Sequence, residues 1–116
     1  MRAAHAAQVP VRSVDEDMRR TLRDRGIPTN DHFFGAAGPE AWWTLERLEQ
    51  QLAALPEEGV SEWMCHPGYT PEAVKSRYGK QREVELATFI HPRARLALSR
   101  LGLRPTTYRV LPRSAR

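Results

Sequence analysis

The segment from Glu62 to Tyr69, read Glu-Trp-Met-Cys-His-Pro-Gly-Tyr, places a histidine where a short apolar run gives way to a turn. Val60 to Cys65 has an apolar bias and turn residues on both sides, which favours a buried parallel strand. In open α/β sheets and barrels, sites gather at the carboxyl ends of strands. At such an end, His66 could donate a proton, hold a developing oxyanion or bind a metal. A buried histidine satisfied by backbone hydrogen bonds is the other open interpretation.

Asp31 and His32 form the second candidate group. A carboxylate beside an imidazole can orient it or bind a cation. Adjacent residues of an extended strand point to opposite faces, so at most one of the two shares a face with the site of His66. An Asx turn or a strand-end contact is the structural alternative for both. The same alternation separates Cys65 from His66 and favours a buried structural cysteine over a nucleophile.

Other polar and aromatic residues leave two interpretations open. Arg82, within Gln81-Arg82-Glu83, could present its charge to a ligand or lie on an exposed helix face with local ion pairs. The adjacent Trp42 and Trp43 could stack on a sugar or a base, or divide between core and rim. The four histidines do not have the spacing of a metal site, and we predict no metal ligands in this chain.

The composition indicates one globular domain. The chain has 116 residues, of which 41% are hydrophobic and 28% charged. No apolar stretch approaches the roughly 20 residues that span a bilayer, and the first residues lack the apolar core of a signal peptide. The single cysteine, Cys65, cannot form an internal disulfide. We therefore expect a cytoplasmic protein with no membrane partner.

The positive charge lies towards the carboxyl end. The chain has a net charge of +4, yet no acidic residue follows Glu85, whereas arginines continue to Arg116. Such a tail could bind phosphate groups, or it could be a solvated helix face with a frayed end. No zinc-finger spacing or aromatic-rich RNA-binding motif accompanies it. The sequence therefore argues against a nucleic-acid partner.

Helical periodicity, caps and turn residues predict the order of elements. We expect helices over Val14–Arg25, which begins with the Ser13–Glu16 capping box and ends at Gly26, from Pro39 to before Pro56, from Thr70 to Tyr78, over Lys80–Ile90 and from Pro92 to Gly102. We expect strands within Asn30–Gly35, over Val60–Cys65 and over Thr106–Leu111, with residues 1–12 and 112–116 irregular. The alternation predicts an α/β fold, a partial (β/α) barrel-like unit of about three parallel strands and four or five helices.

Three ordered motifs point to a family. The first is Thr29 to Gly35, close to Thr-Thr-Asp-His-Phe-x-Gly, and the second is the segment from Glu62 to Tyr69. The third is Arg77-Tyr78 followed by Gln81-Arg82-Glu83-x-Glu85-Leu86, with Leu98, Leu101-Gly102 and Tyr108 continuing the pattern. In order and spacing these residues resemble the YdjC-like carbohydrate deacetylase family, also called the ChbG/HpnK family.

The resemblance implies a metal-dependent hydrolase that removes the acetyl group of an N-acetylated sugar, built on a distorted α/β barrel. By this resemblance His66 would supply acid or oxyanion-stabilising catalysis, and Asp31 would be a catalytic carboxylate at the same mouth. His32 and Tyr69 would contact the substrate, and Arg82 would contact the substrate or brace the loop. A divalent ion, Mg²⁺ or Zn²⁺, is implied as cofactor.

The chain departs from the family in its amino-terminal part. The family's Ala-Asp-Asp-Phe-Gly strand and its later histidine-containing segments, which hold the metal, have no counterpart here. The resemblance is therefore to the carboxyl-terminal portion, and we expect the isolated chain to be inactive. The alternative is a non-catalytic module that completes a barrel with a separate amino-terminal chain, so that this half or a second copy would be a partner.

Overall fold

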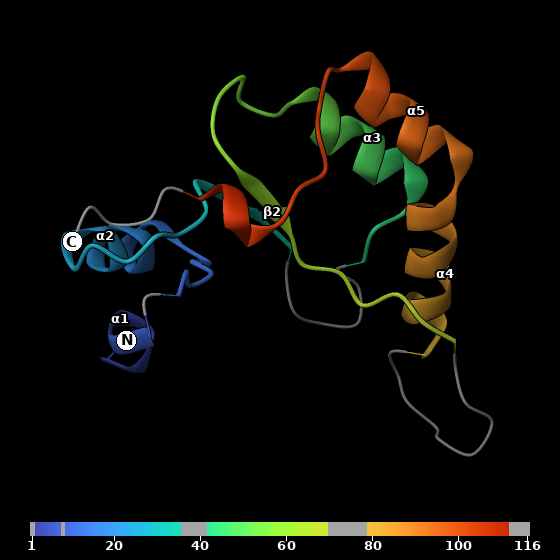
Figure 1. Cartoon of the computed structure of the whole chain (residues 1–116). Coiled ribbons are helices and arrows are strands. Elements are labelled where there is room, and N and C mark those ends of the chain that lie inside the picture. Colours follow the sequence, from blue (N-terminus) through green and yellow to red (C-terminus); the bar gives the residue numbers. More distant parts are fainter. Residues whose placement is uncertain (1, 8, 36–41, 70–78, 112–116) are drawn as a thin grey trace. The chain divides into compact units, whose positions relative to one another are not determined.

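The computed structural model describes residues 2–7, 9–35, 42–69 and 79–111 (Figure 1). These residues belong to two compact units, each formed by segments that are distant in the sequence. The first unit comprises Met1–Phe34, Pro56–Trp63 and Pro105–Arg116, and the second comprises Gly35–Leu55 and Met64–Arg104.

Helix α2 (Glu16–Asp24) of the first unit begins two residues later than its capping box predicts. Its N-cap is Asp15, whose Oδ1 accepts a hydrogen bond from the Met18 N–H at 2.7 Å. The prediction of Ser13 as the cap is wrong, because the Ser13 hydroxyl is buried and donates to Asn30 instead. The end of the helix agrees with the sequence, since Gly26 adopts a φ of 69°, which favours glycine.

Asn30 is completely buried and connects the segments around α2. Its Oδ1 accepts the Ser13 N–H at 2.7 Å, and its Nδ2 donates to the carbonyl groups of Ser13 at 3.0 Å and His32 at 2.9 Å. Its own carbonyl accepts Nε of the buried Arg19 at 3.0 Å. One amide side chain therefore satisfies main-chain groups that precede α2 in the sequence and groups that follow it.

Strands β1 (His32–Phe34) and β2 (Ser61–Trp63) form a parallel pair in which His32 lies opposite Ser61 and Phe34 opposite Trp63. The rings of Phe34 and Trp63 have centroids 4.8 Å apart. Both strands lie where the sequence predicts them, and their parallel pairing is confirmed. Among the described residues these are the two strands of the fold, and no closed barrel is present.

Two predicted segments of the first unit are wrong. Residues 1–12 contain a helix, α1 (Arg2–Ala7), whose alanines have the highest helix propensity. The predicted strand Thr106–Leu111 instead contains a 3₁₀ turn, η1 (Tyr108–Val110), capped by Thr107. This turn brings residues three apart to one side, where the Tyr108 hydroxyl donates to Glu62 and Leu111 is buried.

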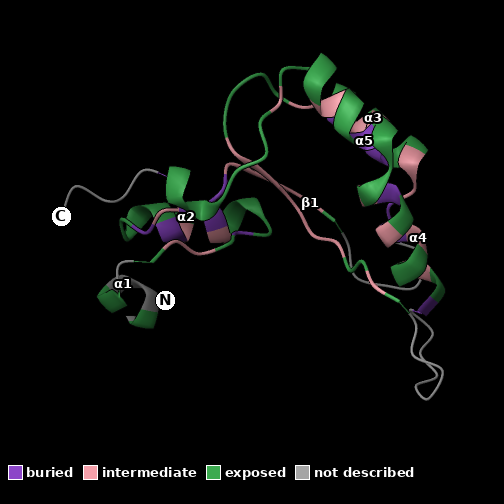
Figure 2. Ribbon diagram, turned by 45° about the vertical axis from the view of Figure 1, so that its right-hand side comes forward, coloured by how far each residue is buried: buried purple, intermediate pink, exposed green. Residues whose placement is uncertain are grey.

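The second unit consists of α3 (Leu45–Ala53), α4 (Gly79–Ile90) and α5 (Pro92–Arg100). Leu48 and Leu52 of α3 and Ala94 of α5 are buried, and these two helices lie side by side (Figures 1 and 2). Leu48 and Leu52 lie four residues apart and form the buried stripe of α3. Trp42, which falls within the predicted helix, precedes α3, because the helix begins after the N-cap Thr44.

The helices α4 and α5 agree closely with the sequence. α5 begins at Pro92, after His91 has capped it by accepting the Arg93 N–H at 3.0 Å, and Gly102 follows its end with a φ of 68°. Pro39, the predicted start of the preceding long helix, and the predicted helix from Thr70 to Tyr78 lie outside the described residues.

We predict that Asn30→Ala lowers the free energy of unfolding by about 3 kcal/mol, because it leaves several buried main-chain groups without partners. Urea denaturation measures this loss. Asp24→Ala, an exposed change at the end of α2, is the control and should stay within about 0.5 kcal/mol of the parent. Equal midpoints for Asn30→Ala and the parent chain would contradict the role of the amide.

Candidate functional site

His66 lies in a loop that follows β2, and its side chain is exposed. The exposure excludes a buried histidine. The main chain of the residue is nevertheless anchored, because its N–H donates to Oε2 of Glu85 at 2.9 Å. An exposed imidazole on a fixed backbone can reach a substrate without losing much conformational entropy.

Glu85 of α4 is 3% exposed and accepts main-chain N–H groups from two other segments. In addition to His66, the N–H of Trp43 lies 3.4 Å from its Oε1. Thr88, one turn further along α4 and also buried, donates to the Trp43 carbonyl at 3.0 Å. Sequence reasoning missed both α4 residues. Their signal was the i, i+3 spacing of a carboxylate in the third motif and a hydroxyl just after Leu86.

Two further hydrogen bonds hold the loop that carries His66. Nε1 of Trp43 donates to the Met64 carbonyl at 3.0 Å, and the Gly68 N–H donates to the Arg82 carbonyl at 3.1 Å. The loop is therefore tied at Met64, His66 and Gly68, which are alternate residues.

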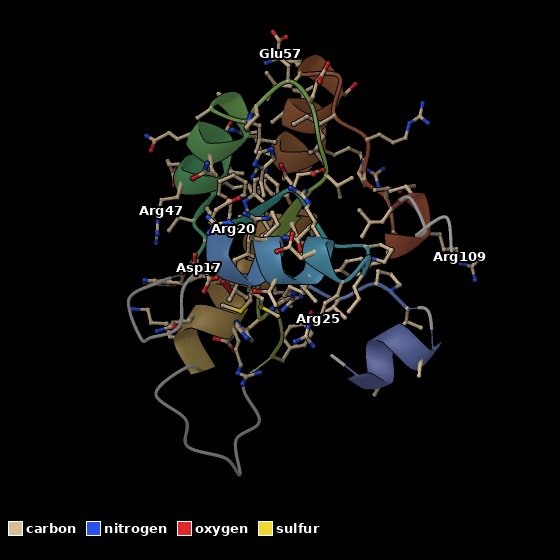
Figure 3. The ribbon with its side chains drawn as sticks, turned by 90° about the vertical axis from the view of Figure 1, so that its left-hand side faces the viewer. Asp17, Arg20, Arg25, Arg47, Glu57 and Arg109 are labelled. Atoms are coloured by element: carbon tan, nitrogen blue, oxygen red, sulfur yellow. The ribbon has the colours of Figure 1, made fainter. Side chains whose placement is uncertain are left out.

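The two tryptophans divide between core and rim. Trp43 is 7% exposed, whereas Trp42 is half-buried. Arg47, labelled in Figure 3, covers this pair: its Cζ lies 5.6 Å from the ring centroid of Trp43, and its Nη1 donates to the Trp42 carbonyl. The indole of Trp43 thus supports the loop from inside.

The two predicted substrate contacts of this unit lie at the surface. Tyr69 is 81% exposed, and Arg82 lies on the exposed side of α4. Both are close in sequence to the anchors of the loop, since Tyr69 follows Gly68 and the Arg82 carbonyl receives the Gly68 N–H. The second unit therefore brings His66 and Arg82 onto one supported loop and helix.

Asp31 belongs to the first unit, where both of its carboxylate oxygens are engaged. Oδ1 accepts Nη2 of Arg23 at 2.5 Å, and Oδ2 accepts the Val60 N–H at 2.7 Å. A side chain at Gly59, which has a φ of 102°, would come within 3.0 Å of Asp31. Asp31 thus fixes the turn that leads into β2.

His32 makes a strand-end contact. Its Nε2 lies 3.3 Å from the Glu58 carbonyl oxygen, so the tautomer with hydrogen on Nε2 donates to that carbonyl. The ring is half-buried. Asp31 and His32 thus both have the structural partners that the alternative interpretation of this pair requires.

Glu62 is the centre of a polar cluster that the sequence did not reveal. Its Oε1 accepts Nε of Arg12 at 2.5 Å, and its Oε2 accepts the Tyr108 hydroxyl. The Arg12 guanidinium also lies 5.6 Å from the ring centroid of Phe33. Burial, together with the hydrogen bond to Glu62, raises the pKa of Tyr108 to about 12, and the same carboxylate raises the pKa of Arg12.

Several arginines have carboxylate partners within their own unit. The ion pairs are Arg12–Glu62, Arg19–Glu16, Arg20–Asp17, Arg23–Asp31 and Arg93–Glu49. Asp17 and Arg20 lie on the outer side of α2, and Arg109 extends from η1 (Figure 3). An exposed pair such as Arg20–Asp17 contributes little to stability, but the pairs balance the positive charge locally.

In the described parts of the chain, no three histidine, cysteine or acidic side chains gather closely enough to hold a metal ion. The side chains that the structure describes therefore do not fit the divalent ion that the resemblance implies. Within the same residues, no helix is long and apolar enough to cross a membrane.

These features define an α/β protein with a supported histidine loop after a parallel strand. The family model described as YdjC-like protein matches residues 1–100, and the chain belongs to this family. A carbohydrate deacetylase of Vibrio parahaemolyticus serotype O3:K6 (strain RIMD 2210633) is 34% identical over 108 residues, which are 87% of this chain and 43% of the relative. A carbohydrate deacetylase of Geobacillus stearothermophilus is 32% identical over 111 residues, which are 91% of this chain and 42% of the relative.

The chain thus spans less than half the length of these relatives. No solved structure matches it significantly.

We predict that Tyr108→Phe reduces the dependence of stability on alkaline pH. In the folded chain Tyr108 has a pKa of about 12, whereas in the unfolded chain its pKa is the ordinary 10.0. Its contribution is complete below pH 10 and is lost as the pH rises towards 12. Denaturation between pH 9 and 12 should therefore show a steeper fall for the parent chain than for Tyr108→Phe. Parallel curves for the two proteins would contradict the shift.

Proposed function

We propose that this chain forms one part of a metal-dependent carbohydrate deacetylase, which hydrolyses the acetamide of an N-acetylated sugar to acetate and a free amine. The family match over residues 1–100 and the two relatives named carbohydrate deacetylase support this proposal. The observation that supports a role for a particular residue concerns His66. Its imidazole is exposed, while its main-chain N–H is hydrogen-bonded to a buried carboxylate.

His66 would act as the acid of the reaction. Cleavage of an amide requires a proton for the departing amine, and the tetrahedral intermediate requires a donor for its oxyanion. A protonated imidazole can serve either purpose. The proposal assigns this work to His66, with Tyr69 and Arg82 of the same unit as contacts for the sugar.

Asp31 and His32 remain in the proposal with a supporting role for Asp31. A carboxylate whose two oxygens already accept Arg23 and Val60 would have to give up one of these bonds to act as a base. We therefore propose that Asp31 holds the turn that leads into β2, and that the half-buried His32 contacts the substrate.

The metal ligands would come from sequence outside this chain. The divalent ion, Mg²⁺ or Zn²⁺, would polarise the amide carbonyl or activate water when bound. A location in the cytoplasm and a partnership with an amino-terminal half, or with a second copy of the chain, belong to the same proposal. The second candidate function is a non-catalytic module that completes a barrel. It is favoured by one observation: among the described side chains, no three histidine, cysteine or acidic residues gather closely enough to hold a metal ion.

The test is acetate release from an N-acetylated sugar with Mg²⁺ or Zn²⁺ added. The full chain is assayed alone and after joining to the part of the Vibrio parahaemolyticus relative outside the match. We expect release from the joined protein only, and a fall in kcat of about 100-fold or more in His66→Ala, because the proton donor is lost.

The matched control is His91→Asn, which changes another exposed histidine but keeps an N-cap for α5. It should leave acetate release unchanged. Full activity in His66→Ala would remove this residue from the mechanism, and a joined protein that binds metal but releases no acetate would favour the non-catalytic module.

A further inference from the structure

Glu85 is a buried carboxylate whose hydrogen bonds end on main-chain groups. It is 3% exposed and lies on α4, and it accepts the N–H groups of His66 and Trp43. A buried carboxylate is costly unless hydrogen bonds replace the water it has lost. The fold bears this cost at the point where α4 meets the loop of the candidate catalytic histidine.

The surrounding bonds restrict the loop on either side of His66. The Met64 carbonyl is held by the indole of Trp43, and the Gly68 N–H is held by the Arg82 carbonyl. Trp43 is itself fixed by Thr88 and Glu85, so that one buried side chain of α4 connects both the loop and the residue that supports it.

We infer that Glu85 is a positioning residue for His66. The inference rests on the proposed function for its catalytic meaning. The carboxylate fixes the main chain from which the exposed imidazole projects, and so it sets where the imidazole can place a proton. Displacement of a catalytic group by about 1 Å can lower the rate about 100-fold, so a buried anchor beneath an exposed acid has a direct catalytic consequence.

Glu85→Leu and Glu85→Gln separate this role from general packing. Leucine provides no acceptor, whereas glutamine keeps the length of the side chain and one acceptor oxygen for the two N–H groups. Glu46→Gln, an exposed carboxylate of α3 in the same unit, is the control.

The first measurement is amide hydrogen exchange in the full chain, which does not depend on activity. We expect the His66 amide to exchange about tenfold faster or more in Glu85→Leu, with Glu85→Gln between this variant and the parent, and Glu46→Gln equal to the parent. The Leu52 amide of α3 reports general unfolding. In Glu85→Gln the acceleration at His66 should exceed that at Leu52. An unchanged His66 amide in Glu85→Leu, or equal acceleration at both sites in Glu85→Gln, would overturn the inference.

The second measurement is acetate release by the joined protein. We expect Glu85→Gln to lower kcat about tenfold or more, with KM within about twofold of the parent, because substrate contacts remain while the acid is misplaced. An unchanged kcat in Glu85→Gln would refute the role of Glu85 in positioning His66 for catalysis. If the parent releases no acetate, the proposed function fails, while the exchange experiment still decides whether Glu85 fixes the loop.

Discussion

The second unit depends on the hydrogen bond between the His66 N–H and the buried carboxylate of Glu85. A loop that leaves a strand must find partners for its main-chain groups, and here α4 supplies them through one side chain and one carbonyl. The same carboxylate accepts the Trp43 N–H, and the indole of Trp43 in turn reaches Met64. Helix, tryptophan and loop thus form one network, in which the loss of one acceptor would leave several groups unsatisfied.

Asn30 has the corresponding place in the first unit, and the chemical difference between the two residues follows from their surroundings. Glu85 faces main-chain N–H groups, so a side chain with acceptors alone fits there. Asn30 faces both an N–H and carbonyl groups, and only an amide offers an acceptor and two donors on one short side chain. Each unit therefore uses a buried polar residue that matches the polarity of the main chain around it.

The features that could be predicted from the sequence are those encoded within a few residues. Helix α5 begins at Pro92 because proline suits a first turn, and the parallel strands end in turn residues that mark their limits. The failures depend on distant partners. The sequence around Ser13 is typical of a helix cap, but the Ser13 hydroxyl donates to the buried Asn30 instead. Thr106–Leu111 has the pattern of a strand, but it forms a turn in which Tyr108 donates to Glu62 and Leu111 is buried. Glu85 was missed for the same reason, since a carboxylate in a helix is ordinarily exposed.

The candidate residues also differ in what their contacts leave them free to do. Both carboxylate oxygens of Asp31 accept hydrogen bonds, from Arg23 and Val60, and these bonds fix the turn before β2. His66 is held through its main chain, whereas its side chain is exposed. A group fixed at the backbone and open at the side chain is suited to proton transfer, whereas a carboxylate with both oxygens engaged is suited to holding a turn. The proposed reaction would therefore take its acid from this chain and its metal-bound chemistry from residues beyond those described here.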